Sequence, residues 1–275
     1  MNLKYLLLLF SILLAVFSCE KKEEPEPEEY TDNSPTGTVI TDDLISSESL
    51  GGLQHYAIYL PPGYDTSALE YPVLYLLHGM WGTYKDWTSH GMAETVNSLI
   101  NLESAKPMVI AMPDGLDAFY CNNYDGGDML YEDYFIEEFI PYIESTYRIR
   151  ASKQNRAIAG LSMGGYGTTF HAFKRPELFC IAYSMSGALS MGESAPDLKE
   201  LITSLSSDQL DNLPAYIMEC GTEDYLVYQS NVEFDAFLTE QDVAHSYITR
   251  SGTHDWPFWM ECLPKALTKA SSIFE

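Results

Sequence analysis

Short, continuous apolar runs alternate with amphipathic segments along most of this chain, and this alternation limits the folds open to it. "YPVLYLLHG" and "PMVIAMPDG" are unbroken apolar runs that end in glycine, as expected of strands covered on both faces. "HYAIYLP" instead alternates apolar and polar residues, which is typical of an exposed antiparallel edge strand. Residues 128–149 have helical spacing, with Asp128 as the expected N-cap. Strand and helix keep alternating to the end of the chain. This order predicts an α/β fold in which a mostly parallel sheet carries helices on both faces.

The composition of the chain argues against two classes of binding partner. The chain has 275 residues, of which 46% are hydrophobic, and this is enough for one large globular domain. Its formal net charge is -25. Such a surface repels phosphate backbones and lacks the basic excess that binds anionic leaflets. We therefore expect no nucleic-acid partner, and no membrane contact of the folded domain. The oligomeric state stays open.

The N-terminus has the pattern of an export signal. Residues 1–18 carry one positive charge, Lys4, followed by an apolar stretch too short to span a bilayer comfortably. The stretch closes with "VFSC", which resembles a bacterial lipobox that ends at Cys19, although Phe17 is bulkier than the usual residue there. We expect Cys19 to be lipidated and to anchor an exported protein to the outer membrane. The alternative is an ordinary secretory signal with an incidental cysteine.

A tether and one large domain follow the signal. Residues 19–37 are acidic and proline-rich, so they cannot bury a core and are expected to form a disordered tether. Acidic residues directly after the cysteine resemble the surface-export signal of some Bacteroidetes lipoproteins, but a solvated spacer explains them equally well. The periplasmic and cell-surface faces of the membrane therefore both stay open. Residues 38–275 show no repeat and no second linker, which indicates a single α/β domain.

One serine stands between glycines at the end of an apolar run. Gly160-Leu161-Ser162-Met163-Gly164 fits G-x-S-x-G between an expected strand and an expected helix. This turn, the nucleophile elbow, holds the serine in a strained conformation. It tolerates no side chains two residues away, because they would collide with the neighbouring strand and helix. "YSMSG" also ends an expected strand, but its Ser184 occupies the place of the first glycine, so we interpret Ser186 as structural.

A base and an acid follow the serine at later strand ends. His254, in "SGTHDW", follows the last expected strand, and Asp224, in "ECGTEDYL", follows the strand before it. Carboxyl ends of parallel strands meet at one edge of a sheet, so the three side chains are expected to converge. The order serine, acid, histidine is that of the Ser–His–Asp triad on an α/β-hydrolase sheet. Glu223 and Asp255 are the competing acids, and a neighbouring side chain such as Asp255 seldom reaches the adjacent imidazole.

"YLLHGMWGTYKDW", "GLSMGGYG", "CGTEDYL" and "GTHDW" together resemble the esterase D-like family of α/β-hydrolases over about residues 50–275. That family includes feruloyl, acetyl-xylan and tributyrin esterases. The resemblance implies a carboxylic ester hydrolase with the α/β-hydrolase fold and with Ser162, Asp224 and His254 as its triad. It also implies that the backbone N–H groups of Met80 and Met163 form the oxyanion hole. No metal or dissociable cofactor is implied.

The substrate is expected to be a small-molecule or oligosaccharide ester with a short acyl or hydroxycinnamoyl group on a carbohydrate. Aromatic residues on segments that border the expected pocket suit sugar rings and aryl acids, and Trp87, Tyr166 and Trp256 are the candidates for contact. An acyltransferase, a siderophore-type esterase and a non-catalytic glycan-binding surface lipoprotein are the alternatives. Turn chemistry explains the acidic loop "YDGGDM" more simply than a metal site does. Four later cysteines permit either free thiols or disulfides. They are Cys121, Cys180, Cys220 and Cys262.

Overall fold

The computed structural model describes residues 34–190 and 194–275, and within them eight strands form one sheet in the order β1-β2-β4-β3-β5-β6-β7-β8. β1 and β2 pair antiparallel, as do β2 and β4, and all other neighbouring strands pair parallel. The mostly parallel sheet expected from the sequence is confirmed. The strands are β1 Thr38–Ser47, β2 Gly52–Leu60, β3 Val73–Leu77, β4 Val109–Pro113, β5 Arg156–Leu161, β6 Ile181–Met185, β7 Ala215–Gly221 and β8 His245–Arg250.

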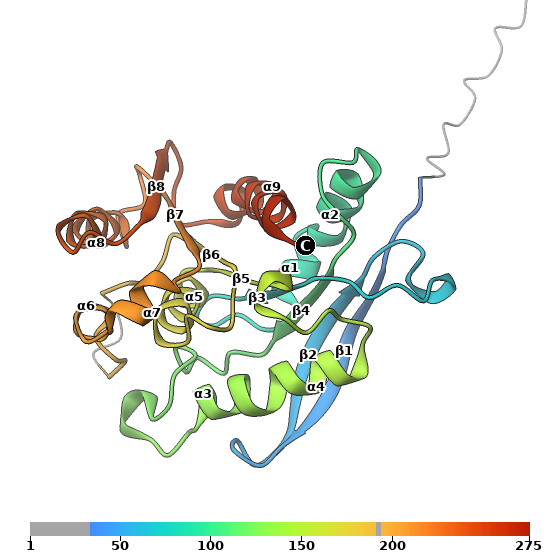
Figure 1. The fold of residues 1–275 in the computed structure, drawn as a ribbon, viewed down its shortest axis with the longest axis horizontal. Helices are drawn as coiled ribbons and strands as arrows, with labels where there is room; N and C mark the ends of the chain where they lie inside the picture. The colour runs from blue at the N-terminus through green and yellow to red at the C-terminus, as the bar shows by residue number, and fades with distance from the viewer. Residues whose placement is uncertain (1–33, 191–193) are drawn as a thin grey trace, which may run out of the picture. The chain divides into compact units, whose positions relative to one another are not determined.

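Helices cover both faces of this sheet, and Figure 1 shows α2 and α9 on one side with α4 and α5 on the other. The helices are α1 Asp86–Ser89, α2 Met92–Asn101, α3 Tyr131–Asp133, α4 Ile140–Thr146, α5 Met163–Lys174, α6 Leu198–Thr203, α7 Ser207–Asp211, α8 Tyr228–Glu240 and α9 Trp256–Ile273. A π-helical stretch, Tyr134–Phe139, joins α3 to α4. None of the helices in the described ranges has both the length and the apolar character needed to cross a lipid bilayer.

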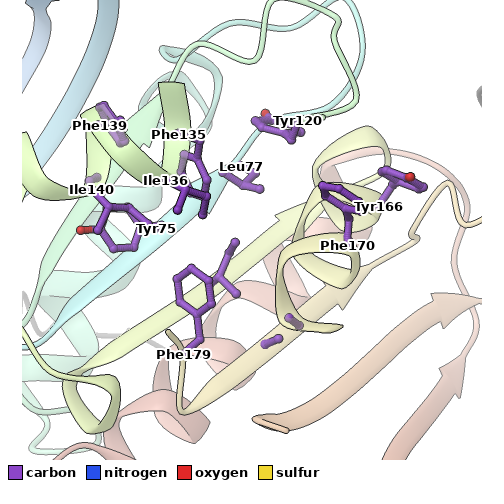
Figure 2. Packing of buried hydrophobic residues seen from close by; sticks show 14 of the residues in the cluster. Tyr75, Leu77, Tyr120, Phe135, Ile136, Phe139, Ile140, Tyr166, Phe170 and Phe179 are labelled. Atoms are coloured by element: carbon purple, nitrogen blue, oxygen red, sulfur yellow. The ribbon is translucent and has the colours of Figure 1, made fainter. Parts of the chain in front are cut away.

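The two faces of the sheet bury two separate apolar clusters, because successive strand residues point to opposite sides. In β3, Tyr75 and Leu77 belong to the cluster under α4 and α5, whereas Leu74 and Leu76 pack under α2 and α9. Figure 2 shows Phe135 and Ile136 of the π-helical stretch directed toward β3. The Tyr75 and Phe135 rings meet edge to face with centroids 5.9 Å apart. Continuous apolar runs in the sequence therefore correspond to strands covered on both sides.

Two local expectations about the strands and helices are wrong. β2 is not the edge strand, because β1, whose mixed sequence "TVITDDLISS" was not identified as a strand, pairs along its outer side. Asp128 is exposed and does not cap the helix, which begins after Leu130 without a side-chain cap. Pro141 at the start of α4 supplies no backbone N–H, and the helix ahead of it is widened to the π form.

Of the expected domain boundaries, the described residues include the start of the α/β domain. Ser34–Glu275 forms one compact unit, and β1 begins at Thr38. The expected signal peptide 1–18, Cys19 and most of the 19–37 tether lie outside the described residues. All four cysteines of the domain are free thiols in this structure. Burial raises the pKa of Cys121 and of Cys220 to about 12 each, which makes both poor nucleophiles at neutral pH.

Candidate active site

Ser162 occupies a strained turn between β5 and α5. Its backbone angles are φ 53° and ψ −115°, a left-handed φ that residues with a side chain rarely adopt. Its N–H donates to Met185 O at 2.9 Å, and its carbonyl accepts from Tyr166 N and Ala188 N at 3.0 Å each. These bonds on both sides hold the turn, so that Ser162 is presented at the N-terminus of α5 beside β6.

The two flanking glycines are required by close packing. A Cβ atom on Gly160 would lie 2.4 Å from Gly164 O and 2.8 Å from Leu77 Cβ. A Cβ atom on Gly164 would lie 2.6 Å from the carbonyl oxygens of both Leu77 and His78. Real Cβ atoms do not approach backbone this closely, so any larger residue forces β3 and α5 apart. The steric reason expected for the glycines of the elbow is therefore present in the structure.

His254 links the serine to a buried acid. It lies between β8 and α9, and its Nε2 is 2.9 Å from Ser162 Oγ. Its Nδ1 is 2.7 Å from Asp224 Oδ2, in the loop after β7. Because a carboxylate can only accept, Nδ1 carries the proton and Nε2 is free to accept one from the serine hydroxyl. The structure thus brings together the three side chains that the sequence places at successive strand ends.

Asp224 is fully buried and its carboxylate is supported on both oxygens. Besides the His254 bond on Oδ2, its Oδ1 accepts the backbone N–H of Val227 at 3.2 Å and that of Leu226 at 3.3 Å. Burial acts to raise the pKa of Asp224, but the hydrogen bond and charge of His254 and the Val227 N–H outweigh it. The net pKa lies below the ordinary value of 3.8. The acid is therefore ionised at neutral pH and can orient the imidazole.

The two competing acids are engaged elsewhere. Glu223 Oε2 accepts the Gly252 N–H at 2.6 Å, which ties the loop after β7 to the loop that carries His254. Asp255 Oδ1 accepts the Phe258 N–H at 3.1 Å, so Asp255 is the N-cap of α9. Among the described residues, Asp224 supplies the only carboxylate hydrogen-bonded to His254. Ser186 is fully buried and does not line the pocket, in keeping with its structural interpretation.

The loop after β3 is held beside the serine by His78. The Gly115 N–H donates to His78 Nε2 at 2.6 Å, so the proton sits on Nδ1, which donates to Gly79 O at 2.7 Å. Met80 follows in this loop and lines the pocket, as does Met163 at the start of α5. Neither backbone N–H donates to another described residue, and that of Met163 belongs to the first turn of a helix, where such groups lack helical partners.

A pocket of about 500 Å³ opens over Ser162 and His254, a size typical of small-molecule sites. Its inner wall is apolar, with Phe119, Leu161 and Trp259 all less than a tenth exposed. The full lining consists of Gly79, Met80, Trp81, Gly82, Asp86, Phe119, Leu161, Ser162, Met163, Ala188, Leu226, His254, Asp255, Trp256 and Trp259.

Of the three aromatic residues expected to contact substrate, one lies in this pocket. Trp256 lines it and stacks on His90 with ring centroids 3.7 Å apart. The expectation is wrong for Trp87, which is fully buried beneath the pocket with its Nε1 donating to Leu77 O. It is also wrong for Tyr166, which is buried on α5 beside Phe170 (Figure 2) and donates its hydroxyl to Pro196 O. Both rings serve the core, because their segments turn them inward.

Several pocket residues were not identified from the sequence, among them Asp86, Phe119 and Leu226. Leu226 stands two residues after Asp224, and Phe119 follows the end of β4, so proximity to strand ends could have pointed to both. For Asp86 there is no comparable indication. Within residues 34–190 and 194–275 no cluster of three or more histidine, cysteine, aspartate or glutamate side chains is arranged to bind a metal ion.

Comparisons with known proteins identify the family of this chain. The model of the family described as "Putative esterase" matches residues 47–270. A curated protein from Xylanibacter ruminicola, named endo-1,4-beta-xylanase/feruloyl esterase, is 31% identical over 83% of this chain, but the match spans only 30% of that protein's length. An acetyl esterase from Caldicellulosiruptor saccharolyticus is 26% identical over 76% of this chain and 86% of its own length.

Solved structures show the same fold. A ferulic acid esterase superposes with a TM-score of 0.80 at 30% identity and covers 88% of this chain and 100% of its own. A ferulic acid esterase from Anaeromyces mucronatus, solved in complex with ferulic acid, has a TM-score of 0.71 at 21% identity. It covers 88% of this chain and 94% of its own, and at that identity it supports the fold alone. The expected α/β-hydrolase fold and the motif resemblance are both confirmed.

Proposed function

This chain belongs to the family described as "Putative esterase", and from that premise we propose that it is a serine carboxylester hydrolase acting on short-acyl or hydroxycinnamoyl esters of carbohydrates. One observation carries the proposal. The unbroken hydrogen-bond chain from Asp224 through His254 to Ser162 opens onto an apolar pocket. A serine hydroxyl is a weak nucleophile unless a base accepts its proton, and this arrangement supplies the base.

The chemistry proceeds in two halves through an acyl-enzyme. His254 Nε2 takes the hydroxyl proton as Ser162 Oγ attacks the ester carbonyl, whose π electrons move onto oxygen. When this tetrahedral species collapses, the bond to the alcohol oxygen breaks and His254 returns the proton to that oxygen. Water then enters, loses a proton to His254, attacks the acyl-enzyme, and releases the acid as Ser162 regains its proton.

Two backbone N–H groups are the donors that we propose for the oxyanion. They belong to Met80 and Met163, which both line the pocket together with Ser162. α5 adds the positive end of its dipole at the same point, because Met163 is its first residue. Each donor of this kind lowers the barrier by about 3–4 kcal/mol in related chemistry.

The choice of substrate class draws on the pocket and on the relatives. The pocket has enough volume for an aryl or short acyl group, and its inner wall is apolar and aromatic. Two similar proteins are named for feruloyl or acetyl ester activity.

We extend the proposal to location: the lipid anchor at Cys19 would keep the enzyme at the outer membrane, close to polysaccharide fragments.

The direct test is release of acid from acetylated and feruloylated xylo-oligosaccharides by the purified domain. We expect hydrolysis of at least one of them by the wild type, and none by Ser162→Ala at equal protein concentration. Ser186→Ala serves as the comparison serine. Its hydroxyl helps to lower the pKa of Asp224, so we expect a modest loss of activity, far smaller than that of Ser162→Ala. Turnover of p-nitrophenyl acetate without any turnover of the saccharide esters would retain the hydrolase but reject the carbohydrate substrate. No turnover of any ester would favour the non-catalytic glycan-binding alternative.

A further inference from the structure

Two aromatic side chains beside the candidate site are exposed to solvent, and one of them, Trp81, lines the pocket. Of the large apolar side chains that are exposed in the described part of the chain, only Trp81 and Tyr225 are aromatic, at 88% and 93% exposed. Each directly follows a residue of the candidate site, Trp81 after Met80 and Tyr225 after Asp224. Exposed aromatic side chains that gather at one place on a surface commonly mark a binding site, whereas scattered ones need no explanation.

Trp81 is held in its exposed position by a strained loop. Its φ is 61°, an unusual conformation for a bulky residue, and its backbone N–H donates to Asp117 Oδ1 at 2.6 Å. The acceptor loop is itself unusual, because Leu116, Asp117 and Phe119 also have positive φ. Strain of this kind persists where the surrounding structure enforces it, and it clusters at functional sites. No burial of the ring compensates for it, since the ring is almost fully exposed.

The ester's two halves must contact different parts of this site. The inner wall, with Phe119 and Trp259, is closed and can enclose an acyl group. An oligosaccharide cannot enter a pocket of about 500 Å³ together with that group, so it must remain at the mouth. Trp81 and Leu226 line the pocket and are 88% and 56% exposed, so they form that mouth.

The chemistry of the mouth suits a neutral sugar. The apolar C–H face of a pyranose or furanose ring packs on an aromatic face and leaves its hydroxyl groups in water. Asp86 and Asp255 line the same pocket and supply carboxylate oxygens that accept hydrogen bonds from hydroxyl groups. The net charge of -25 opposes an anionic lipid surface or an acidic polymer at this position.

We propose that Trp81 and Tyr225 form a saccharide-binding rim that selects esters by their alcohol portion, with Trp81 stacking on the sugar next to the scissile bond. The inference rests on the proposed ester hydrolysis but concerns a different part of the substrate. Trp81 is a specificity residue, because its ring contacts the sugar and takes no part in proton transfer.

The kinetic test compares two esters with the same acyl group. If the enzyme prefers hydroxycinnamoyl groups, the two substrates are methyl ferulate and a feruloylated arabinoxylo-oligosaccharide. If it prefers acetyl groups, they are p-nitrophenyl acetate and an acetylated xylo-oligosaccharide. We expect Trp81→Ala to raise KM for the saccharide ester about tenfold, while kcat/KM for the simple ester stays within about twofold. Trp81→Phe should restore most of the saccharide preference. Leu102→Ala removes an exposed apolar side chain (70% exposed) that does not line the pocket, and it should change neither value.

A binding measurement keeps this inference separate from catalysis. Calorimetric titration of Ser162→Ala protein with neutral, unesterified xylo-oligosaccharide should give saturable binding. Adding Trp81→Ala should weaken that binding about tenfold, and adding Tyr225→Ala should also weaken it. An equal loss for both esters through kcat would instead mean that Trp81 only braces the Met80 loop, which overturns the inference. Absence of oligosaccharide binding by Ser162→Ala protein at millimolar concentrations would overturn it too, even if the hydrolase activity is intact.

Discussion

Replacing the Asp224 carboxylate by an asparagine amide exchanges one oxygen for an NH₂ group and should slow catalysis by orders of magnitude while the side chain keeps its size. Asp224 Oδ1 accepts two backbone N–H groups, and Oδ2 accepts the proton on His254 Nδ1. In Asp224→Asn, the amide oxygen must stay toward the Val227 and Leu226 N–H groups, because an NH₂ there would face two donors. The NH₂ group then faces Nδ1, so Nδ1 must lose its proton and Nε2 must carry it.

The wrong tautomer has a large kinetic consequence. A protonated Nε2 donates to Ser162 Oγ and cannot accept its proton. The equivalent substitution in serine proteases lowers kcat about 10⁴-fold, and we expect about the same loss here. That loss corresponds to about 5 kcal/mol of transition-state stabilisation. Steady-state kcat with p-nitrophenyl acetate measures it, with circular dichroism to verify the fold.

Matched acid variants make this prediction refutable. Glu223→Gln keeps an acceptor oxygen for the Gly252 N–H, and Asp255→Asn keeps one for the α9 cap, so both should stay within about tenfold of wild type. A loss near 10⁴-fold in Glu223→Gln, with Asp224→Asn nearly active, would refute the assignment of the acid.

Four further predictions concern the elbow glycine, the buried acid, the lipid anchor and the acyl group. Gly164→Ala should destabilise the fold by about 1–3 kcal/mol and lower kcat, because its Cβ meets two carbonyls of the β3 end. Gly127→Ala should do neither, because its Cβ would meet only Tyr124 O at 3.6 Å, an ordinary contact distance, and thermal unfolding with kcat measurements tests both variants. Because the folded pKa of Asp224 lies below its ordinary value of 3.8, its charge stabilises the fold above that pH. The difference in unfolding free energy between wild type and Asp224→Asn should shrink as pH falls below 3.8, and denaturant titration across that range tests it. Cys19→Ser should move the protein from the membrane fraction to the soluble fraction or block its processing, and unchanged membrane association would count against lipidation. kcat/KM for p-nitrophenyl esters of two to twelve carbons should peak at short chains, whereas a maximum at eight carbons or longer would contradict the substrate class.

Local steric rules allowed the centre of the site to be predicted from the sequence. Gly160 and Gly164 are dictated by contacts within two residues of Ser162 and with the adjacent strand, so the elbow is recognisable as a short motif. Asp224 and His254 follow from the rule that parallel strands end at one edge of the sheet. The two residues are 30 positions apart and lie in separate loops, yet they share a hydrogen bond, because the strand order limits where those loops can lie.

Burial and long-range pairing could not be predicted in the same way. Trp87 and Tyr166 stand beside site motifs in the sequence, yet both rings point into the core, because helix direction and not sequence proximity sets their orientation. β1 has a mixed polar sequence that becomes a strand only by pairing with β2. The role of His78 in holding the Met80 loop depends on Gly115, 37 residues away, and no pattern in the sequence joins the two.

The measurement that tests the central claim most directly is covalent labelling by a fluorophosphonate, followed by peptide mass spectrometry. The reagent reacts with a serine only when a neighbouring base activates its hydroxyl. The account predicts stoichiometric labelling of the peptide that contains Ser162, with loss of hydrolysis in step with labelling. It also predicts no labelling of Ser162→Ala and sharply slower labelling of Asp224→Asn. Labelling of Ser186, or full activity in a protein that is completely labelled, would contradict it.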